Sequence, residues 1–570
     1  MPSVLVAHDT PNAATDYLVV PEHTAPSFHY RVGKAHHLPD FTTVAPAETE
    51  RSIDIQQPAA NEQPVVGSGS CALAYVTEAL ERDPFRRILI LERGDLWLPT
   101  HFQNLPLPFK MTYNSTLRFL HGSCPFFGGR STFWSAWSPR PKPELMRGFP
   151  PYLLNAASSE ELWKKASALL HVTKASDIED QVFGVLQKDI DARLSSHINQ
   201  IPTANTTESA PLSVGRTFAT TSVRFNKFST PGPLLALQER QRRLAHAKKG
   251  SPLMIATNVV ARQLQVDTDD DNKVNVLRTS RGDLLFPDGK TNVILAAGAI
   301  PNTTLLLNSL PEMQSRAGSR ITGHFLTHIA ARFPIDGTLG KLSDHLEIAA
   351  NYVAGKDTSG LQYHIQVTAL HSPNPEQDAE DAARECPDFA AAATEEQLKG
   401  SEKHIVLVCA TLGELDEHNP NSWVKPNSQV SDPTTNIKVQ ITLTDKDKAL
   451  WTTMDKATYD AIAVMAGAQS GNVEYWAKSP NSDTWGWSKS KPAVEDIRVP
   501  GVVHEAATLY MGDRSNAGAS VDDHYRPFGS NNVYVTGAAL FPSSGSWNPT
   551  LTMCGYAQDL ARKIVTPRAV

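Results

Sequence analysis

The apolar positions of this chain repeat with different periods in its outer and middle parts. A short apolar run ends at Val66, residues 73–82 follow with helical spacing, and a second apolar run covers residues 87–91. A strand, a helix and a strand in this order predict a β-α-β unit with two parallel strands. The short apolar runs at residues 293–295 and 533–535 each lead towards a glycine and a helical segment, which predicts two further strands.

The middle of the chain, from about residue 330 to 480, has a different pattern. Strand-like segments cover residues 346–353, 361–370, 405–413 and 435–443, and an amphipathic helix is predicted for residues 449–468. Residues 375–403 are acidic and rich in alanine, which predicts a surface helix or lid. Interleaved strands followed by one helix favour a substrate domain built on an antiparallel sheet flanked by helices.

Composition and charge exclude several classes of protein. The 570 residues carry a formal net charge of −7. This charge does not favour the basic surface that a nucleic-acid partner would need. The chain shows no signal peptide and no run of about 18 apolar residues for a membrane span, and we therefore expect a cytoplasmic protein. The five cysteines are scattered and form no Cys-x-x-Cys pair, which disfavours structural zinc and a disulfide scaffold.

A glycine-rich turn follows the first predicted strand. Gly67 and Gly69 belong to the pattern Gly-x-Gly-x-x-Ala that ends at Ala72. In such a turn the first glycine permits a tight bend, the second lets the backbone approach a pyrophosphate, and the alanine lets the helix pack on the strand. The helix that begins near Ser70 offers unpaired N–H groups to phosphate. Glu92, after the second strand, is placed to accept a hydrogen bond from a ribose.

Arg93, next to Glu92, is assigned to the same predicted nucleotide site. The prediction has one weakness, because the residues before Val65 read Ala-Asn-Glu-Gln-Pro. A buried strand is ordinarily a run of about four to eight apolar residues. A weak first strand leaves open a protein that binds FAD or NAD without catalysing a reaction.

A second glycine-rich segment, Gly-Gly-Arg-Ser-Thr-Phe-Trp, covers residues 128–134. It resembles the first signature of the glucose–methanol–choline (GMC) flavoprotein oxidoreductases, closest to the pyranose-oxidase-like branch. The resemblance implies bound FAD, with this segment under the flavin ring, because paired glycines let the backbone contact a flat ring. The implied cofactor contacts are Gly128, Gly129, Ser131, Thr132, Phe133 and Trp134. The alternative is a glycine turn beside a buried aromatic cluster.

Pyranose oxidases carry a His that is bonded covalently to the flavin at the position of Phe133. Because Phe133 has no nucleophilic nitrogen, we predict FAD that is not histidyl-linked.

The C-terminal block, residues 501–564, resembles the last signature of the same family. His504 fits its His-x-x-x-Thr pattern, although Ala507 stands where the family usually has Gly, and Asn548 begins its Asn-Pro-x-x-Thr ending. By resemblance, His504 is the catalytic base and Asn548 orients the substrate oxygen over the flavin. An imidazole, with an unperturbed pKa near 6.5, suits the removal of a hydroxyl proton.

Further cofactor contacts follow from the same resemblance. Pro549 and Thr550 begin a helix whose dipole is expected to point at the flavin pyrimidine carbonyl. Val260 is expected to contact adenine through its backbone. The second family signature implies contacts from the turn after residues 293–295, and the last signature implies contacts from the turn after residues 533–535. These residues are Ala297, Gly298, Gly537 and Ala538.

Three other sets of residues have open interpretations. His324 and His328 are candidate metal ligands, but no third ligand is near in sequence, so core or supporting histidines are favoured and no metal is predicted. Residues 267–273 suggest a calcium loop, although they lack the pattern of an EF-hand and a charged hairpin tip is favoured. Trp476, Trp485 and Trp487 lie in a predicted loop and either shape a substrate pocket or pack between domains.

The sequence therefore predicts an α/β fold, α+β overall, with a Rossmann-like FAD-binding domain and a second substrate domain. The predicted FAD-binding domain comprises residues 61–145, 236–328 and 500–570, and the substrate domain residues 146–235 and 329–499, after an irregular extension of residues 1–60. The resemblance implies an FAD-dependent oxidoreductase that acts on a CH–OH group of a sugar, polyol or other alcohol. The electron acceptor would be oxygen or a quinone. The alternatives are an FAD-containing lyase of the cyanohydrin type and a catalytically silent homologue.

Overall fold

The structure is a computed structural model, which describes residues 63–96, 107–119, 122–132, 134–178, 181–214, 227–267, 272–286, 290–337, 340–385, 392–479, 482 and 484–568. The predicted extension of residues 1–60, the side chain of Phe133 and most of the acidic segment 267–273 lie outside the described residues. Among the described helices, none combines the length and the apolar character that a bilayer crossing needs.

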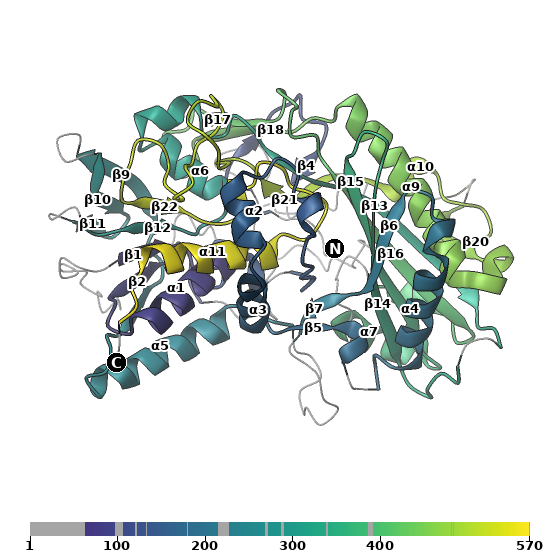
Figure 1. The fold of residues 1–570 in the computed structure, drawn as a ribbon. Coiled ribbons are helices and arrows are strands. Elements are labelled where there is room, and N and C mark those ends of the chain that lie inside the picture. Colours follow the sequence, from purple (N-terminus) through teal and green to yellow (C-terminus); the bar gives the residue numbers. More distant parts are fainter. Residues whose placement is uncertain are drawn as a thin grey trace.

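A five-stranded parallel sheet organises one half of the structure (Figure 1). The strand order is β22-β12-β1-β2-β8, and every neighbouring pair is parallel. The strands are almost entirely buried and rich in Val, Ile and Leu, as expected for a parallel sheet covered on both faces. Their bounds are β1 (Gln63–Val66), β2 (Ile88–Leu91), β8 (Leu253–Ala256), β12 (Val293–Leu295) and β22 (Val533–Val535).

The central strand β1 forms although its sequence begins with a polar residue. Gln63 is buried, its amide nitrogen donates a hydrogen bond to the Tyr75 hydroxyl at 2.7 Å, and its oxygen accepts one from Arg86 Nε at 2.6 Å. Because these partners satisfy the polar side chain, burying it carries little penalty. The weak apolar pattern before Val65 therefore does not prevent a strand between β12 and β2.

Four helices accompany this sheet. Figure 1 shows α1, α11 and α5 running beside one another, and α1 packs directly on α11. Their bounds are α1 (Ser70–Arg82), α5 (Pro231–His246), α6 (Ala299–Leu307) and α11 (Thr550–Ile564). Helix α6 follows β12 directly, and α11 is the last described helix.

A nine-stranded sheet organises the other half. Its order is β20-β19-β13-β16-β15-β14-β6, with β21 paired to β13 and to β4. All of its pairs are antiparallel except β21 with β4. The bounds are β4 (Arg118–Phe119), β6 (Ala204–Ser209), β13 (Thr322–Pro334), β14 (Glu347–Lys356), β15 (Gln362–His371), β16 (His404–Glu414), β19 (Glu474–Lys478), β20 (Trp485–Ser488) and β21 (Arg498–Ala506).

The two faces of the nine-stranded sheet have different neighbours. Helices α4 (Val185–His197) and α9 (Asp445–Ala466) pack against it (Figure 1). Directly paired residues share a face and successive residues alternate, so the register puts His324, Tyr352, His364 and Gln366 on one common face. All four of these polar side chains are buried.

The smaller elements complete the fold. Three small sheets have the orders β11-β10-β9, β17-β18-β3 and β5-β7. Their strands are β3 (Lys110–Met111), β5 (Val172–Lys174), β7 (Pro211–Ser213), β9 (Ala261–Asp267), β10 (Lys273–Thr279), β11 (Gly282–Leu285), β17 (Trp423–Pro426) and β18 (Ile437–Gln440). The other α-helices are α2 (Pro151–Ala157), α3 (Glu160–Leu169), α7 (Pro375–Glu385), α8 (Glu395–Leu398) and α10 (Val494–Ile497).

Several elements differ from the sequence predictions. The tryptophans at 476, 485 and 487, predicted to lie in a loop, instead belong to the antiparallel pair β19 and β20. Helix α9 begins earlier than predicted because the Thr444 side chain accepts a hydrogen bond from Asp447 N and caps it. The domain boundary predicted at residues 328–329 falls within β13, and the division into domains stays a prediction.

Candidate active site

The ends of the parallel strands bring the predicted cofactor residues to one edge of the sheet. Neighbouring parallel strands share their carboxyl edge, and the loops that follow them form a crevice there. The loops after β1, β2, β8, β12 and β22 hold Gly67, Gly69, Ser70, Glu92, Arg93, Val260, Ala297, Gly298, Gly537 and Ala538. These residues come from widely separated parts of the sequence.

The glycines in these loops meet two different requirements. Gly67 has φ +102°, and a Cβ there would lie 2.6 Å from the Ala296 carbonyl oxygen, so only glycine fits. For Gly69, Gly298 and Gly537, no neighbouring atom comes closer than 3.9 Å to the position of a Cβ. These three turns therefore leave space beside the backbone, although Gly537 itself is buried. The glycine set fits a cradle for a dinucleotide cofactor.

Glu92 is buried at the end of β2 and connected to the Gly-Gly segment. The Ser68 hydroxyl donates to Glu92 Oε2 and accepts a hydrogen bond from Gly128 N at 2.9 Å. The second oxygen, Oε1, accepts from Gly94 N at 3.0 Å. Burial is the main cause that raises the pKa of Glu92 from 4.5 to about 7.

Glu92→Gln is expected to flatten the pH dependence of stability. A carboxyl whose pKa is raised on folding binds more protons in the folded state. Its contribution to the free energy of unfolding therefore falls as pH rises from 4.5 to about 7. Urea unfolding of apoprotein should show that, between pH 5 and pH 8, the free energy of unfolding falls on the order of a few kcal/mol more in the wild type than in Glu92→Gln. An equal loss in both proteins would contradict the predicted ionisation.

The polar side chains of the Gly-Gly segment hold its own turn together. Ser131 Oγ donates to Gly128 O at 2.7 Å and accepts from Thr230 N at 3.0 Å. Thr132 Oγ1 donates to Gly129 O at 2.9 Å, and Trp134 Nε1 to a backbone carbonyl at 2.7 Å. These hydroxyls stabilise the short helix η3 (Gly129–Thr132), so we expect cofactor contacts here through backbone groups.

Val260 and Arg93 have protein partners in the structure. Val260 N donates to Ser280 Oγ, and Val260 O accepts from Ser280 N, both at 2.9 Å. An adenine contact would therefore have to use the second lone pair of the Val260 carbonyl. Arg93 Nη1 donates to Thr434 Oγ1 at 3.0 Å. The cofactor contacts of both residues stay predictions.

His504 lies near the end of β21 in an unusual backbone conformation. Its φ is +58°, a region that costs non-glycine residues energy and is enriched at functional sites. The pairing of β21 with β13 shifts register on both sides of His324. The half-buried His504 ring meets His324 edge-on, and their Nδ1 atoms are 2.9 Å apart.

His324 connects His504 to the loop before α11. Its Nε2 atom lies 2.8 Å from the Gly545 carbonyl oxygen, three residues before Asn548. The His324 side chain is fully buried, and burial lowers its pKa to about 4. His324 therefore stays neutral near pH 7, and the structure brings His504 and the loop before Asn548 together around it.

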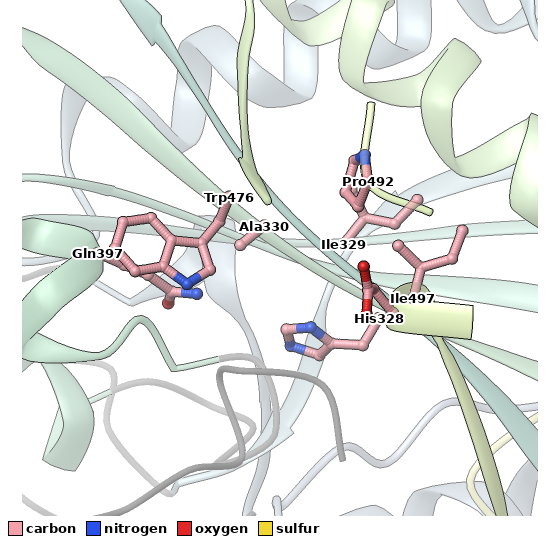
Figure 2. Close-up of a pocket in the computed structure, with 8 residues that line it drawn as sticks. His328, Ile329, Ala330, Gln397, Trp476, Pro492 and Ile497 are labelled. Carbon is pink, nitrogen blue, oxygen red and sulfur yellow. The ribbon is translucent and has the colours of Figure 1, made fainter. Parts of the chain in front are cut away.

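From the sequence, His324 and His328 are candidate metal ligands for which core or supporting roles are favoured. The geometry does not bring these two side chains together as a metal site. Both residues lie on β13, where a separation of four residues corresponds to about 13 Å. Both ring nitrogens of His324 have protein partners. His328 instead lines a small pocket with Trp476, Pro492 and Ile497 (Figure 2).

Two residues that the sequence analysis missed hold the amide of Asn548. The Tyr352 hydroxyl donates to Asn548 Oδ1 at 2.9 Å, and Gln366 Nε2 donates to the same oxygen at 3.0 Å. With both donors on Oδ1, the Nδ2 group becomes the donor end of the amide on the opposite side. The nine-stranded sheet thus fixes the orientation of the side chain that is predicted to hold a substrate oxygen.

Removing the two donors is expected to impair orientation. We expect the double variant Tyr352→Phe/Gln366→Met to slow anaerobic flavin reduction by roughly 5- to 160-fold, because each hydrogen bond contributes about 0.5–1.5 kcal/mol. Stopped-flow absorbance would measure this rate. A double variant with wild-type kinetics would show that the orientation of Asn548 does not limit catalysis.

Two further contacts connect segments that are predicted to form the cofactor site and the catalytic site. Arg130, in the Gly-Gly segment, forms a 3.0 Å ion pair with Glu505, the neighbour of His504. Cys554, in the second turn of α11, lies with its Sγ 3.6 Å from the carbonyl oxygen of Ser70, at the start of α1. The positive ends of two helix dipoles therefore lie near each other at this site, an arrangement suited to an anionic group.

Comparisons with known proteins agree with this geometry. Residues 420–557 match the family model described as GMC oxidoreductase. Among solved structures, the chain is similar to pyridoxine 4-oxidase from Mesorbium loti, with a TM-score of 0.56 and 14% sequence identity over 90% of this chain and 100% of that chain. No curated protein sequence matches.

The class of protein follows from these findings. The structural likeness, at its low identity, shows the fold, in which a Rossmann-like parallel sheet accompanies a large antiparallel sheet as predicted. The match of residues 420–557 to the GMC oxidoreductase model confirms the resemblance found in the sequence. The chain is accordingly assigned to the oxidoreductases.

Proposed function

We propose that this chain is an FAD-dependent oxidoreductase that oxidises a CH–OH group of a sugar, polyol or other alcohol. The observation that carries the proposal is the meeting of His504 and the Asn548 loop around His324. The Gly-Gly segment reaches the same place through the Arg130–Glu505 ion pair. An imidazole and an oriented amide beside a dinucleotide cradle suit hydride removal from an alcohol.

FAD is the proposed cofactor, held without a histidyl bond. The glycine turns at residues 67–69, 128–129, 297–298 and 537–538 would hold it, with phosphates near the first residues of α1. Bound FAD would supply a flavin N5 atom that accepts the hydride. The fit rests on the space at Gly69, Gly298 and Gly537, where no neighbouring atom comes closer than 3.9 Å to the position of a Cβ.

The side chains of this chain perform the remaining steps of the proposed reaction. Asn548 Nδ2 donates a hydrogen bond to the alcohol oxygen, since its Oδ1 is occupied by Tyr352 and Gln366. His504 takes the hydroxyl proton, and the general-base contribution is about 10²- to 10⁴-fold. The almost complete burial of Asn548 excludes water from the orienting contact.

The electron acceptor is proposed to be oxygen or a quinone. The name of the similar structure, pyridoxine 4-oxidase, describes an oxidase, which supports oxygen as the acceptor to test first. Peroxide formation and quinone reduction during turnover would separate the two acceptors.

Anaerobic flavin reduction tests the proposed function. The purified protein should be yellow, and a panel of sugars, polyols and aryl alcohols added without oxygen should bleach the visible flavin band with at least one member. A lyase would leave the flavin oxidised while cleaving a cyanohydrin. A colourless protein that takes up no FAD would contradict the assignment.

A further inference from the structure

We infer that His324 is a positioning residue that fixes the tautomer of His504, so that Nε2 of His504 carries the lone pair that takes the alcohol proton. The inference deepens the proposed function and rests on it. The carrying observation is the contact series from the Gly545 carbonyl through both nitrogens of His324 to His504 Nδ1, with distances of 2.8 Å and 2.9 Å.

The direction of each hydrogen bond follows from the end of the series. The Gly545 carbonyl oxygen can only accept, so His324 Nε2 must be the donor. A neutral imidazole has one N–H, so His324 Nδ1 then carries a lone pair and accepts. Its partner 2.9 Å away, His504 Nδ1, must therefore donate. Two unprotonated nitrogens at this distance would repel each other.

The surroundings of His324 keep it neutral. The ring is fully buried, and that burial lowers its pKa to about 4. On β16 the paired residue is Glu414, whose carboxylate lies 3.4 Å from Arg147. On β15, the buried His364 faces the ring edge-on with centroids 6.2 Å apart. A neutral ring between a carbonyl and His504 fits these neighbours.

The fixed tautomer determines where the proton goes. When the alcohol is oxidised, its hydroxyl proton moves to His504 Nε2, and its C–H bond breaks with the electron pair passing to the flavin proposed above, leaving a carbonyl product. The resulting imidazolium keeps its Nδ1–H bond to His324. The series therefore prepares His504 as a base before the substrate binds.

Two substitutions at one position separate tautomer control from packing. The amide oxygen and nitrogen of Asn lie at the δ position, like His Nδ1, so His324→Asn keeps an acceptor for His504 Nδ1 and loses the bond to Gly545. The amide oxygen and nitrogen of Gln lie at the ε position, like His Nε2, so His324→Gln keeps the Gly545 bond and loses the acceptor. Both variants leave a buried amide of similar polarity.

The kinetic test uses flavin-loaded protein and the best alcohol from the panel. We expect His324→Gln to lower the limiting rate of anaerobic flavin reduction by at least about tenfold with little change in KM, and His324→Asn to stay within about threefold of wild type. Equal losses in both variants, or a greater loss in His324→Asn, would overturn the inference.

A second measurement needs neither turnover nor a variant at position 324. In protein labelled with ¹⁵N in its histidine rings, the His504 signals are identified by their loss in His504→Gln. The expected result is a protonated Nδ1 and an unprotonated Nε2 near pH 7, and the opposite tautomer would overturn the inference. This result stands even if no alcohol reduces the flavin, so the failure of the proposed function would be distinguishable.

Discussion

Replacing His504 by alanine is expected to slow anaerobic flavin reduction by at least about 100-fold while FAD stays bound. The imidazole is the proposed base, and its half-buried ring lies beside His324. Asn548→Ala is expected to cost at least about tenfold, because the alcohol oxygen loses its oriented donor. Stopped-flow absorbance under excess substrate measures both rates.

The matched control for these variants is His246→Ala. His246 is exposed in the last turn of α5, away from the carboxyl edge of the parallel sheet, and we expect its variant to reduce flavin at the wild-type rate. FAD content, measured after denaturation, should be equal in all four proteins. If His504→Ala and Asn548→Ala both retain wild-type reduction rates, neither residue takes part in the reaction.

Gly67→Val is expected to abolish FAD binding. The Cβ atom of the valine would lie 2.6 Å from the Ala296 carbonyl oxygen and 2.8 Å from Ala297 Cα, in a backbone conformation with φ +102°. The conformation alone costs about 1–2 kcal/mol for a residue with a side chain, and the backbone contact forces the turn apart. We expect less than about a tenth of the wild-type FAD content and a lower melting temperature.

Gly232→Ala provides the control for the effect of adding a Cβ atom. Gly232 lies in the first turn of α5, and no atom stands within 4 Å of its Cβ position. Alanine there favours the helix by up to about 1 kcal/mol, so stability should be unchanged or slightly raised. A Gly67→Val protein with normal FAD content would show that the first turn does not hold the cofactor.

The outer parts of the fold were predictable because their signals are local. A glycine such as Gly67 is required by the φ of its own turn, and the apolar runs of β2 and β12 are buried as continuous segments. His504 and Asn548 were identified through resemblance, and the structure shows the strands and loops that bring their segments together. Their catalytic roles stay predictions.

The supporting residues could not be predicted because their roles depend on long-range register. Tyr352 and Gln366 face each other across β14 and β15, and only the pairing of these strands turns both towards Asn548. The local sequence around each residue shows only the alternating pattern of a strand, which does not identify a partner. His324 was noticed as one of two histidines, but its partner His504 is 180 residues away.

The most direct test of the whole account is the electron density of bound cofactor in crystals of the yellow protein. The account predicts one FAD, with its phosphates beside the turn at Gly67 and Gly69 and its flavin ring between the Gly-Gly segment and the His504–Asn548 pair. No bond should join the ring to Phe133. Density for a different nucleotide, or a flavin ring remote from His504 and Asn548, would contradict the account.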